Sequence, residues 1–174
     1  MTGFKDMTGV PEFLAHAITL EQEAAVRFDE LAGMLEVHNN HKGVVDLFRK
    51  MAHFSRLHLA EAKERAEGVD VPKLAPWEFK WPGDESPESG TIEDAHYLMT
   101  AHHALTLALA SETRGYDFYQ GLADKAADAQ VREMAQEFAD EEADHVATLK
   151  EWLTRYPEPE STWNEDMDPP VSVD

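Results

Sequence analysis

Residues 17–32, AITLEQEAAVRFDELA, recur in altered form as residues 108–123, ALASETRGYDFYQGLA. Apolar side chains in both stretches follow one another at intervals of three or four residues, which is the spacing of one face of an α-helix. Each apolar face carries a glutamate near its middle, Glu21 in the first copy and Glu112 in the second. The match predicts two related helices, each with one acidic side chain at a corresponding height.

A second pair of stretches repeats in the same way. The segment LFRKMAHFSRLH at residues 47–58 matches MAQEFADEEADH at residues 134–145, and the match sets His58 against His145. Each half of the chain therefore reads as a helical hairpin, and two related hairpins can pack around a pseudo-twofold axis. Such packing would bring the matching polar residues together at one site.

Helical spacing of apolar residues extends over four long segments. Pro11 suits the first turn of a helix, and Gly68 and Pro157 suit the ends of two others. Thr91 and Asp94 resemble a capping box that opens the third helix. We therefore expect helices at about residues 11–37, 42–67, 91–124 and 128–156.

The connection at residues 68–90 holds four prolines and two tryptophans and is too long for a simple helix–helix turn. A connection of this length can run the full height of a bundle, so the helices that it joins can be parallel. The sequence thus predicts an all-α fold: a four-helix bundle of two antiparallel helical hairpins joined by a long crossover loop. The predicted domain covers residues 1–156, and an acidic, irregular tail follows at residues 157–174.

Polar side chains interrupt the apolar face of every predicted helix at mid-height. In chain order they are Glu21, Ser55, His58, Glu112, Glu142 and His145. A single buried histidine, or a glutamate at the edge of an apolar face, is common in helical cores, but recurrence at matched heights favours a shared site. Burying several carboxylates costs on the order of several kcal/mol per ion unless positive charge matches them. No Lys or Arg lies on these faces, whereas a divalent metal ion would supply that charge.

This arrangement resembles the dinuclear carboxylate site of ferritin-like proteins, in which two helices each carry a Glu and the other two carry Glu-x-x-His. The local pattern A-[IL]-x-x-E-x-x-[AG]-x-x-x-[FY] of the first and third helices is similar to that of rubrerythrins, without a rubredoxin module. The resemblance covers about residues 11–156. It implies that Glu21 and Glu112 are terminal metal ligands, that Glu142 bridges two ions, and that His58 and His145 each bind one ion.

Two positions depart from the family pattern. Ser55 stands where the second helix should carry a bridging Glu, so three carboxylates face a site that needs four to neutralise two divalent ions. A hydroxide could bridge instead, or the site could hold one ion; His53 and Glu61 are nearby in sequence, but their angular positions point away from Ser55. Gly115 stands where rubrerythrins that react with peroxide carry an extra Glu, which argues against a peroxide reductase.

The composition of the chain excludes or disfavours several kinds of site and binding partner. The chain has no cysteine, which excludes disulfides, iron–sulfur centres and Cys-ligated zinc. A formal net charge of −20 disfavours nucleic-acid binding. No apolar run reaches the roughly 18 residues that a membrane span needs, and the N-terminus lacks the pattern of a signal peptide, so we expect a cytoplasmic protein.

The function expected from this resemblance is that of a non-haem metal protein, with two irons per chain or one, and with zinc or manganese as other possible metals. Its chemistry would be iron oxidation or the reduction of O₂ or peroxide, with an external electron donor. Two alternatives remain: a metal-binding or storage protein without catalysis, and a degenerate scaffold that binds a partner. The resemblance also implies a homodimer.

Overall fold

The computed structural model describes residues 7, 9–38, 41–83, 85–88 and 100–157. Within them four α-helices form the fold: α1 (Val10–His38), α2 (Lys42–Arg65), α3 (Ala101–Lys125) and α4 (Ala129–Arg155). One short 3₁₀ helix, η1 (Pro76–Glu78), lies in the crossover between α2 and α3. No helix in these ranges combines the length and apolar character that a membrane span requires.

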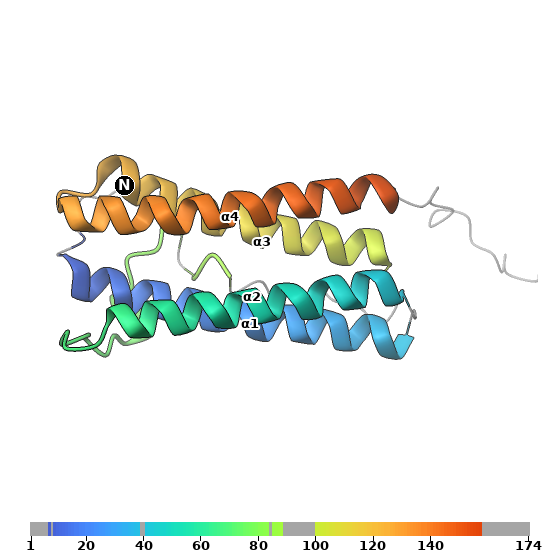
Figure 1. The fold of residues 1–174 in the computed structure, drawn as a ribbon, viewed down its shortest axis with the longest axis horizontal. Coiled ribbons are helices and arrows are strands. Elements are labelled where there is room, and N and C mark those ends of the chain that lie inside the picture. The colour runs from blue at the N-terminus through green and yellow to red at the C-terminus, as the bar shows by residue number, and fades with distance from the viewer. Residues whose placement is uncertain (1–6, 8, 39–40, 84, 89–99, 158–174) are drawn as a thin grey trace, which may run out of the picture.

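The four helices pair as two hairpins, with α1 packed along α2 and α3 packed along α4. Figure 1 shows that α2 and α3 run in the same direction, so the crossover between them returns along the length of the bundle. The predicted all-α bundle of two antiparallel hairpins joined by a long crossover is therefore confirmed.

Local sequence explains where α3 and α4 begin. The Asp128 side chain caps α4 by accepting hydrogen bonds from the backbone N–H groups of Gln130 (2.8 Å) and Val131 (3.3 Å). The predicted start of the third helix near Thr91 is wrong for α3. Thr100 has an extended backbone and caps the helix instead, accepting a hydrogen bond from the backbone N–H of His103 at 3.1 Å. The capping box predicted at Thr91 lies outside the described residues, as does nearly all of the acidic tail.

The buried apolar side chains form two clusters, one toward each end of the bundle. One cluster holds Phe28, Leu35, Phe48 and Leu105 among others. The other holds Phe13, Leu20, Phe118, Tyr119, Leu122 and Phe138 among others. On every helix the polar residues of the repeat fall between these two clusters, so the fold surrounds them with apolar packing on both sides.

The crossover packs against α1 and α3 on the side of the His16 ring. That ring contacts the rings of Phe79 and Trp81, with centroids 5.0 and 4.7 Å away. Its Nε2 accepts a hydrogen bond from the backbone N–H of Lys80 at 2.8 Å, and its Nδ1 lies 2.8 Å from the carbonyl oxygen of Glu12. These contacts hold the middle of the crossover on the surface of the bundle.

Candidate metal centre

Each helix brings at least one member of the predicted site to mid-height. Glu21 lies on α1, His58 on α2, Glu112 on α3, and Glu142 and His145 on α4. The three carboxylates are no more than 2 % exposed, and the two histidine side chains are 14 % and 12 % exposed. The structure therefore brings all five residues together in the interior, as the internal repeat predicted.

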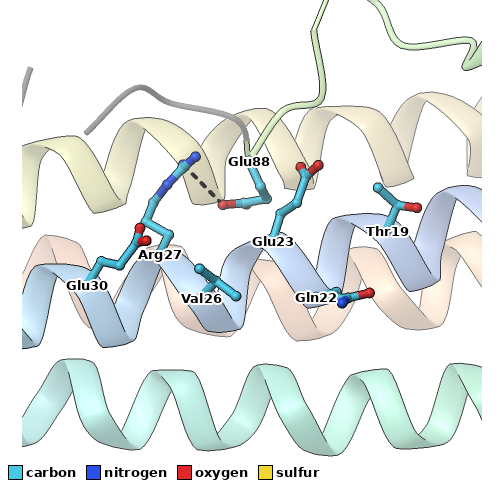
Figure 2. A pocket seen from close by; sticks show the side chains of 7 residues that line it. All are labelled: Thr19, Gln22, Glu23, Val26, Arg27, Glu30 and Glu88. Atoms are coloured by element: carbon cyan, nitrogen blue, oxygen red, sulfur yellow. Dashed lines mark hydrogen bonds and ion pairs between the residues drawn. The ribbon is translucent and has the colours of Figure 1, made fainter. Parts of the chain in front are cut away.

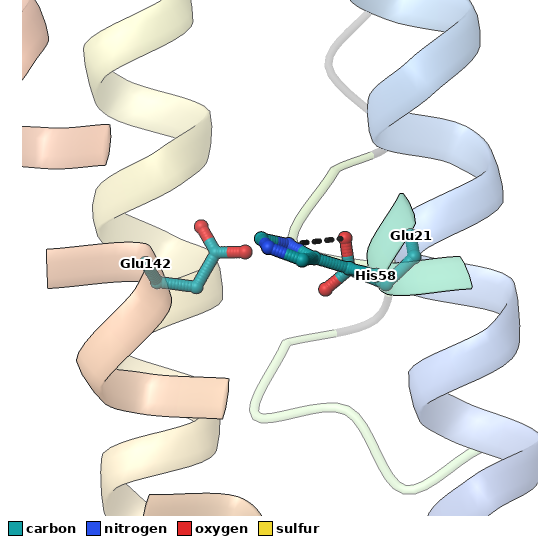
Figure 3. Close-up of side chains that lie close together, drawn as sticks. All are labelled: Glu21, His58 and Glu142. Atoms are coloured by element: carbon teal, nitrogen blue, oxygen red, sulfur yellow. Dashed lines mark ion pairs between the residues drawn. The ribbon is translucent and has the colours of Figure 1, made fainter. Parts of the chain in front are cut away.

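These residues form two overlapping groups of potential ligands. The first is Glu21, His58 and Glu142, and the second is Glu112, Glu142 and His145. Within each group, one ligand atom from every residue lies within 4.8 Å of the others. Figure 3 shows the first group, in which the carboxylate of Glu142 points across the bundle toward His58 and Glu21. Glu142 belongs to both groups and lies between them.

The two histidines occupy related positions. Nδ1 of His58 lies 3.8 Å from Oε2 of Glu21, and Nδ1 of His145 lies 3.1 Å from Oε2 of Glu112. The two imidazole rings stack with their centroids 5.4 Å apart and an angle of 14° between their planes. Each ring thus faces the glutamate of the neighbouring helix in its own hairpin, which preserves the pseudo-twofold relation of the two halves.

Burial and mutual repulsion control the protonation of the carboxyl groups. Burial and the charge of Glu112 raise the pKa of Glu142 well above its ordinary value, and the same two causes raise the pKa of Glu21. Burial also opposes ionisation of Glu112, but hydrogen bonds from Glu142 and His145 outweigh it and lower the pKa of Glu112. Ionising all three carboxyl groups at once therefore costs free energy unless positive charge is added nearby.

Several buried polar atoms of the cluster lack hydrogen-bond partners within the described part of the chain. They are Glu21 Oε2, His58 Nδ1, Glu112 Oε1 and Glu142 Oε2. Buried polar atoms are normally satisfied, so a set of four orphaned ligand atoms facing one space requires an explanation. Divalent cations bound by carboxylate oxygen and imidazole nitrogen would satisfy them and offset the repulsion. The residues present thus fit a metal centre.

Two further side chains contact the cluster from outside. The buried hydroxyl of Tyr119 donates a hydrogen bond to Oε1 of Glu21 at 3.2 Å. Oε2 of Glu141 lies 3.3 Å from Nε2 of His58, the nitrogen opposite the one that faces Glu21. Burial raises the pKa of Glu141 to about 7. Carboxylates that contact the outer nitrogen of a histidine ligand commonly fix its ring orientation.

The site also includes charged residues that the helical pattern did not predict. Arg27, on α1, is 9 % exposed, and its guanidinium donates hydrogen bonds to Glu88 and Ser111. The sequence prediction found no cation on the apolar faces; Arg27 lies off that face and reaches the interior through its long side chain. Glu88 comes from the crossover, where no helical spacing marks a residue as buried.

Ser55 and Gly115, the two positions that depart from the family pattern, are both buried. Ser55 is 1 % exposed and lies on the inner face of α2. Of the two residues considered as its replacements, His53 is exposed, and Glu61 pairs with Arg65 at 3.0 Å while its charge also acts on Glu21 and His58. Gly115 is buried on α3 and lies between Glu88 and Glu142, since a Cβ placed there would lie 3.2 Å from Glu88 Oε1 and 3.7 Å from Glu142 Oε2.

An all-α bundle of two hairpins with a carboxylate–histidine cluster at mid-height defines the class of ferritin-like proteins. The Rubrerythrin family model matches residues 103–169. A crystal structure of an uncharacterized conserved protein from Magnetospirillum magnetotacticum MS-1 is 44 % identical to this chain, with a TM-score of 0.74. The match covers 88 % of this chain and 99 % of that one. A comparison with curated proteins found no match. The chain belongs to the rubrerythrin family.

Proposed function

We propose that this protein binds two divalent metal ions, preferentially iron, in the centre formed by Glu21, His58, Glu112, Glu142 and His145. Glu21 and His58 hold one ion, Glu112 and His145 hold the other, and Glu142 bridges them. The observation that carries this proposal is the pair of overlapping ligand groups that share Glu142. Membership of the rubrerythrin family supports iron as the metal.

Bound iron would supply one-electron redox chemistry, which suits the oxidation of Fe(II) as substrate or the reduction of O₂ or peroxide. The residues of the chain provide the surroundings for it. Tyr119 holds one oxygen of Glu21 by a hydrogen bond, and Glu141 contacts the outer nitrogen of His58. The two apolar clusters above and below the site limit the access of water. Repeated reduction of an oxidant would need an electron donor that returns the iron to Fe(II), and the chain has no cysteine to ligate a second iron centre for this task.

Elemental analysis of protein purified without chelators tests the metal centre directly. We expect about two irons per chain, on the basis of two ligand groups with one shared carboxylate. One metal per chain would indicate a mononuclear site, and a metal-free protein that cannot be reconstituted would refute the proposal. Anaerobic reconstitution with Fe(II) removes uncertainty about loading during expression.

Mixing the reconstituted protein with air, or with peroxide, then separates redox turnover from simple binding. We expect oxidation of Fe(II) faster than in buffer alone, followed by absorbance in the near ultraviolet. If metal binds in the expected ratio but its oxidation is no faster than in buffer, the protein is a binding or storage protein.

A further inference from the structure

A fourth carboxylate reaches the interior of the bundle from the crossover. Glu88 is 1 % exposed, and its Oε2 lies 3.4 Å from a guanidinium nitrogen of Arg27. Its Oε1 has no hydrogen-bond partner in the described part of the chain. Figure 2 shows the side chain entering from the crossover between α1 and α3. A buried carboxylate oxygen without a hydrogen-bond partner is unfavourable unless a cation or a hydrogen-bond donor lies next to it.

The orphaned oxygen of Glu88 lies next to Gly115 and near Glu142 of the metal centre, although Glu88 belongs to neither of the two ligand groups. A Cβ built on that glycine would lie 3.2 Å from Oε1 of Glu88 and 3.7 Å from Oε2 of Glu142. Those two oxygens therefore flank the same small space, and both lack hydrogen-bond partners among the described residues. A side chain at position 115 would fill this space, so the glycine is what allows Glu88 to approach Glu142.

We propose that Glu88 is a ligand of the metal centre and supplies the carboxylate that Ser55 cannot. This inference rests on the dinuclear site proposed above. Three helical carboxylates are one fewer than the four of the family pattern, and Glu88 adds a fourth carboxylate ligand beside them, with its charge shared with Arg27. The ligand thus comes from the crossover instead of from α2, and it enters beside the bridging Glu142.

The contact with Arg27 does not fully use the Glu88 carboxylate. Charge-assisted N–H···O bonds are usually about 2.7–2.9 Å long, and this one is 3.4 Å. The same guanidinium also donates to the Ser111 hydroxyl, so Arg27 keeps a partner if Glu88 turns toward a metal ion. Only one oxygen of Glu88 is engaged by Arg27, which leaves the other for a ligand role.

Glu88 also lines a pocket of about 490 Å³ on the outer side of α1, together with Glu23, Arg27 and Glu30. Figure 2 shows Glu30 and Glu88 on either side of the Arg27 side chain and Glu23 beyond Glu88. One carboxylate oxygen of Glu23 is also buried without a hydrogen-bond partner among the described residues. Glu88 thus connects an acidic pocket, to which cations are attracted, with the centre inside the bundle.

Zn(II) and Co(II) titrations of the full-length, metal-free protein against a chromophoric chelator test this assignment. The variants are E88Q, which keeps the size of the side chain, and E30Q, which removes one charge from the same pocket at an exposed position. We expect two ions in the wild type and in E30Q. In E88Q we expect the first ion to bind normally and the second to bind at least tenfold more weakly, because one ligand and its charge are lost. The metal-induced rise in Tm should shrink in parallel.

The outcomes separate this inference from the proposed function. A wild type that binds no metal overturns both. A wild type and an E88Q variant that bind two ions with equal affinity overturn the ligand role and leave Glu88 as a counter-ion of Arg27. Circular dichroism of the metal-free proteins checks folding. If E88Q is unfolded, E88D replaces it: the shorter side chain keeps its charge but withdraws its oxygen from the site, and undiminished binding of the second ion by E88D overturns the inference.

Discussion

Replacing Tyr119 by phenylalanine removes one hydroxyl and leaves the ring in place. That hydroxyl is fully buried and donates to Oε1 of Glu21 at 3.2 Å. This hydrogen bond favours the ionised form of Glu21, whose pKa burial and the charge of Glu112 otherwise raise. Binding of a metal ion requires ionised Glu21, so the variant must supply more free energy to deprotonate it.

The size of the effect follows from the bond that is lost. A hydrogen bond to a charged group contributes about 1.5–3 kcal/mol, and about 1.4 kcal/mol corresponds to a tenfold change in affinity. We therefore expect Y119F to weaken binding of the ion held by Glu21 and His58 by roughly tenfold to a hundredfold, the range typical of residues that support metal ligands. The ion held by Glu112 and His145 should be much less affected, because Tyr119 makes its hydrogen bond to Glu21 alone among the carboxylates of the centre.

Competition titration with Co(II) under anaerobic conditions measures both affinities. Tyr116→Phe is the matched control, since it removes the same atom from a less buried tyrosine on the same helix. Affinities in Y119F within twofold of the wild type for both ions would refute the role assigned to this hydroxyl. An equal loss for both ions would show that the effect passes through the whole core and not through Glu21.

Three further predictions concern the core, a ligand and the crossover. Phe138→Ala should destabilise the metal-free protein by about 3–5 kcal/mol in urea unfolding, since the ring is 2 % exposed; a cost below about 1 kcal/mol would contradict its place in the core. His145→Ala should reduce the metal content of purified protein by about one ion per chain, whereas His53→Ala, at an exposed position, should leave it unchanged. Burial lowers the pKa of His16, so the stability that its neutral ring contributes is present above about pH 6.5 and is lost as the pH falls through its folded-state pKa. Hydrogen exchange at the Lys80 amide, corrected for intrinsic rates, should therefore become less protected on acidification, and constant protection down to pH 5 would contradict this role.

The helices and the helical part of the site could be predicted because both depend on regular spacing. Apolar periodicity fixes which face of a helix is buried, and a polar residue on that face is then conspicuous. The internal repeat matches Glu21 to Glu112 and His58 to His145, and it therefore predicts that these polar residues share one site. These residues lie close together in the structure. The structure also confirms the crossover topology that the long connection predicts.

The remaining features lie where spacing gives no information. The sequence predicts the start of the third helix near Thr91, because residues 91–94 resemble a capping box and helical apolar spacing follows. In the structure α3 begins only after Thr100, whose backbone is extended. Arg27 was missed because a long side chain can bring its charge inside from a position off the buried face. Glu88 was missed because a crossover without helical period offers no rule for which of its side chains point inward. Its burial depends on the tertiary contacts of the crossover with α1 and α3.

The pseudo-twofold relation of the two hairpins is broken at one ligand position. In the ligand role proposed for Glu88, the crossover supplies the side chain that this position lacks. Glu142 on α4 is matched on α2 by Ser55, so the matched helical positions supply three carboxylates to the proposed two-ion site. Within the described residues, a segment outside the repeat that passes beside the site can add a carboxylate without changing a helix. The crossover does so, and Gly115 provides the space for Glu88 next to Glu142. In proteins of this fold that lack a helical carboxylate, the crossover opposite a small residue on the third helix is therefore the place to look for its replacement.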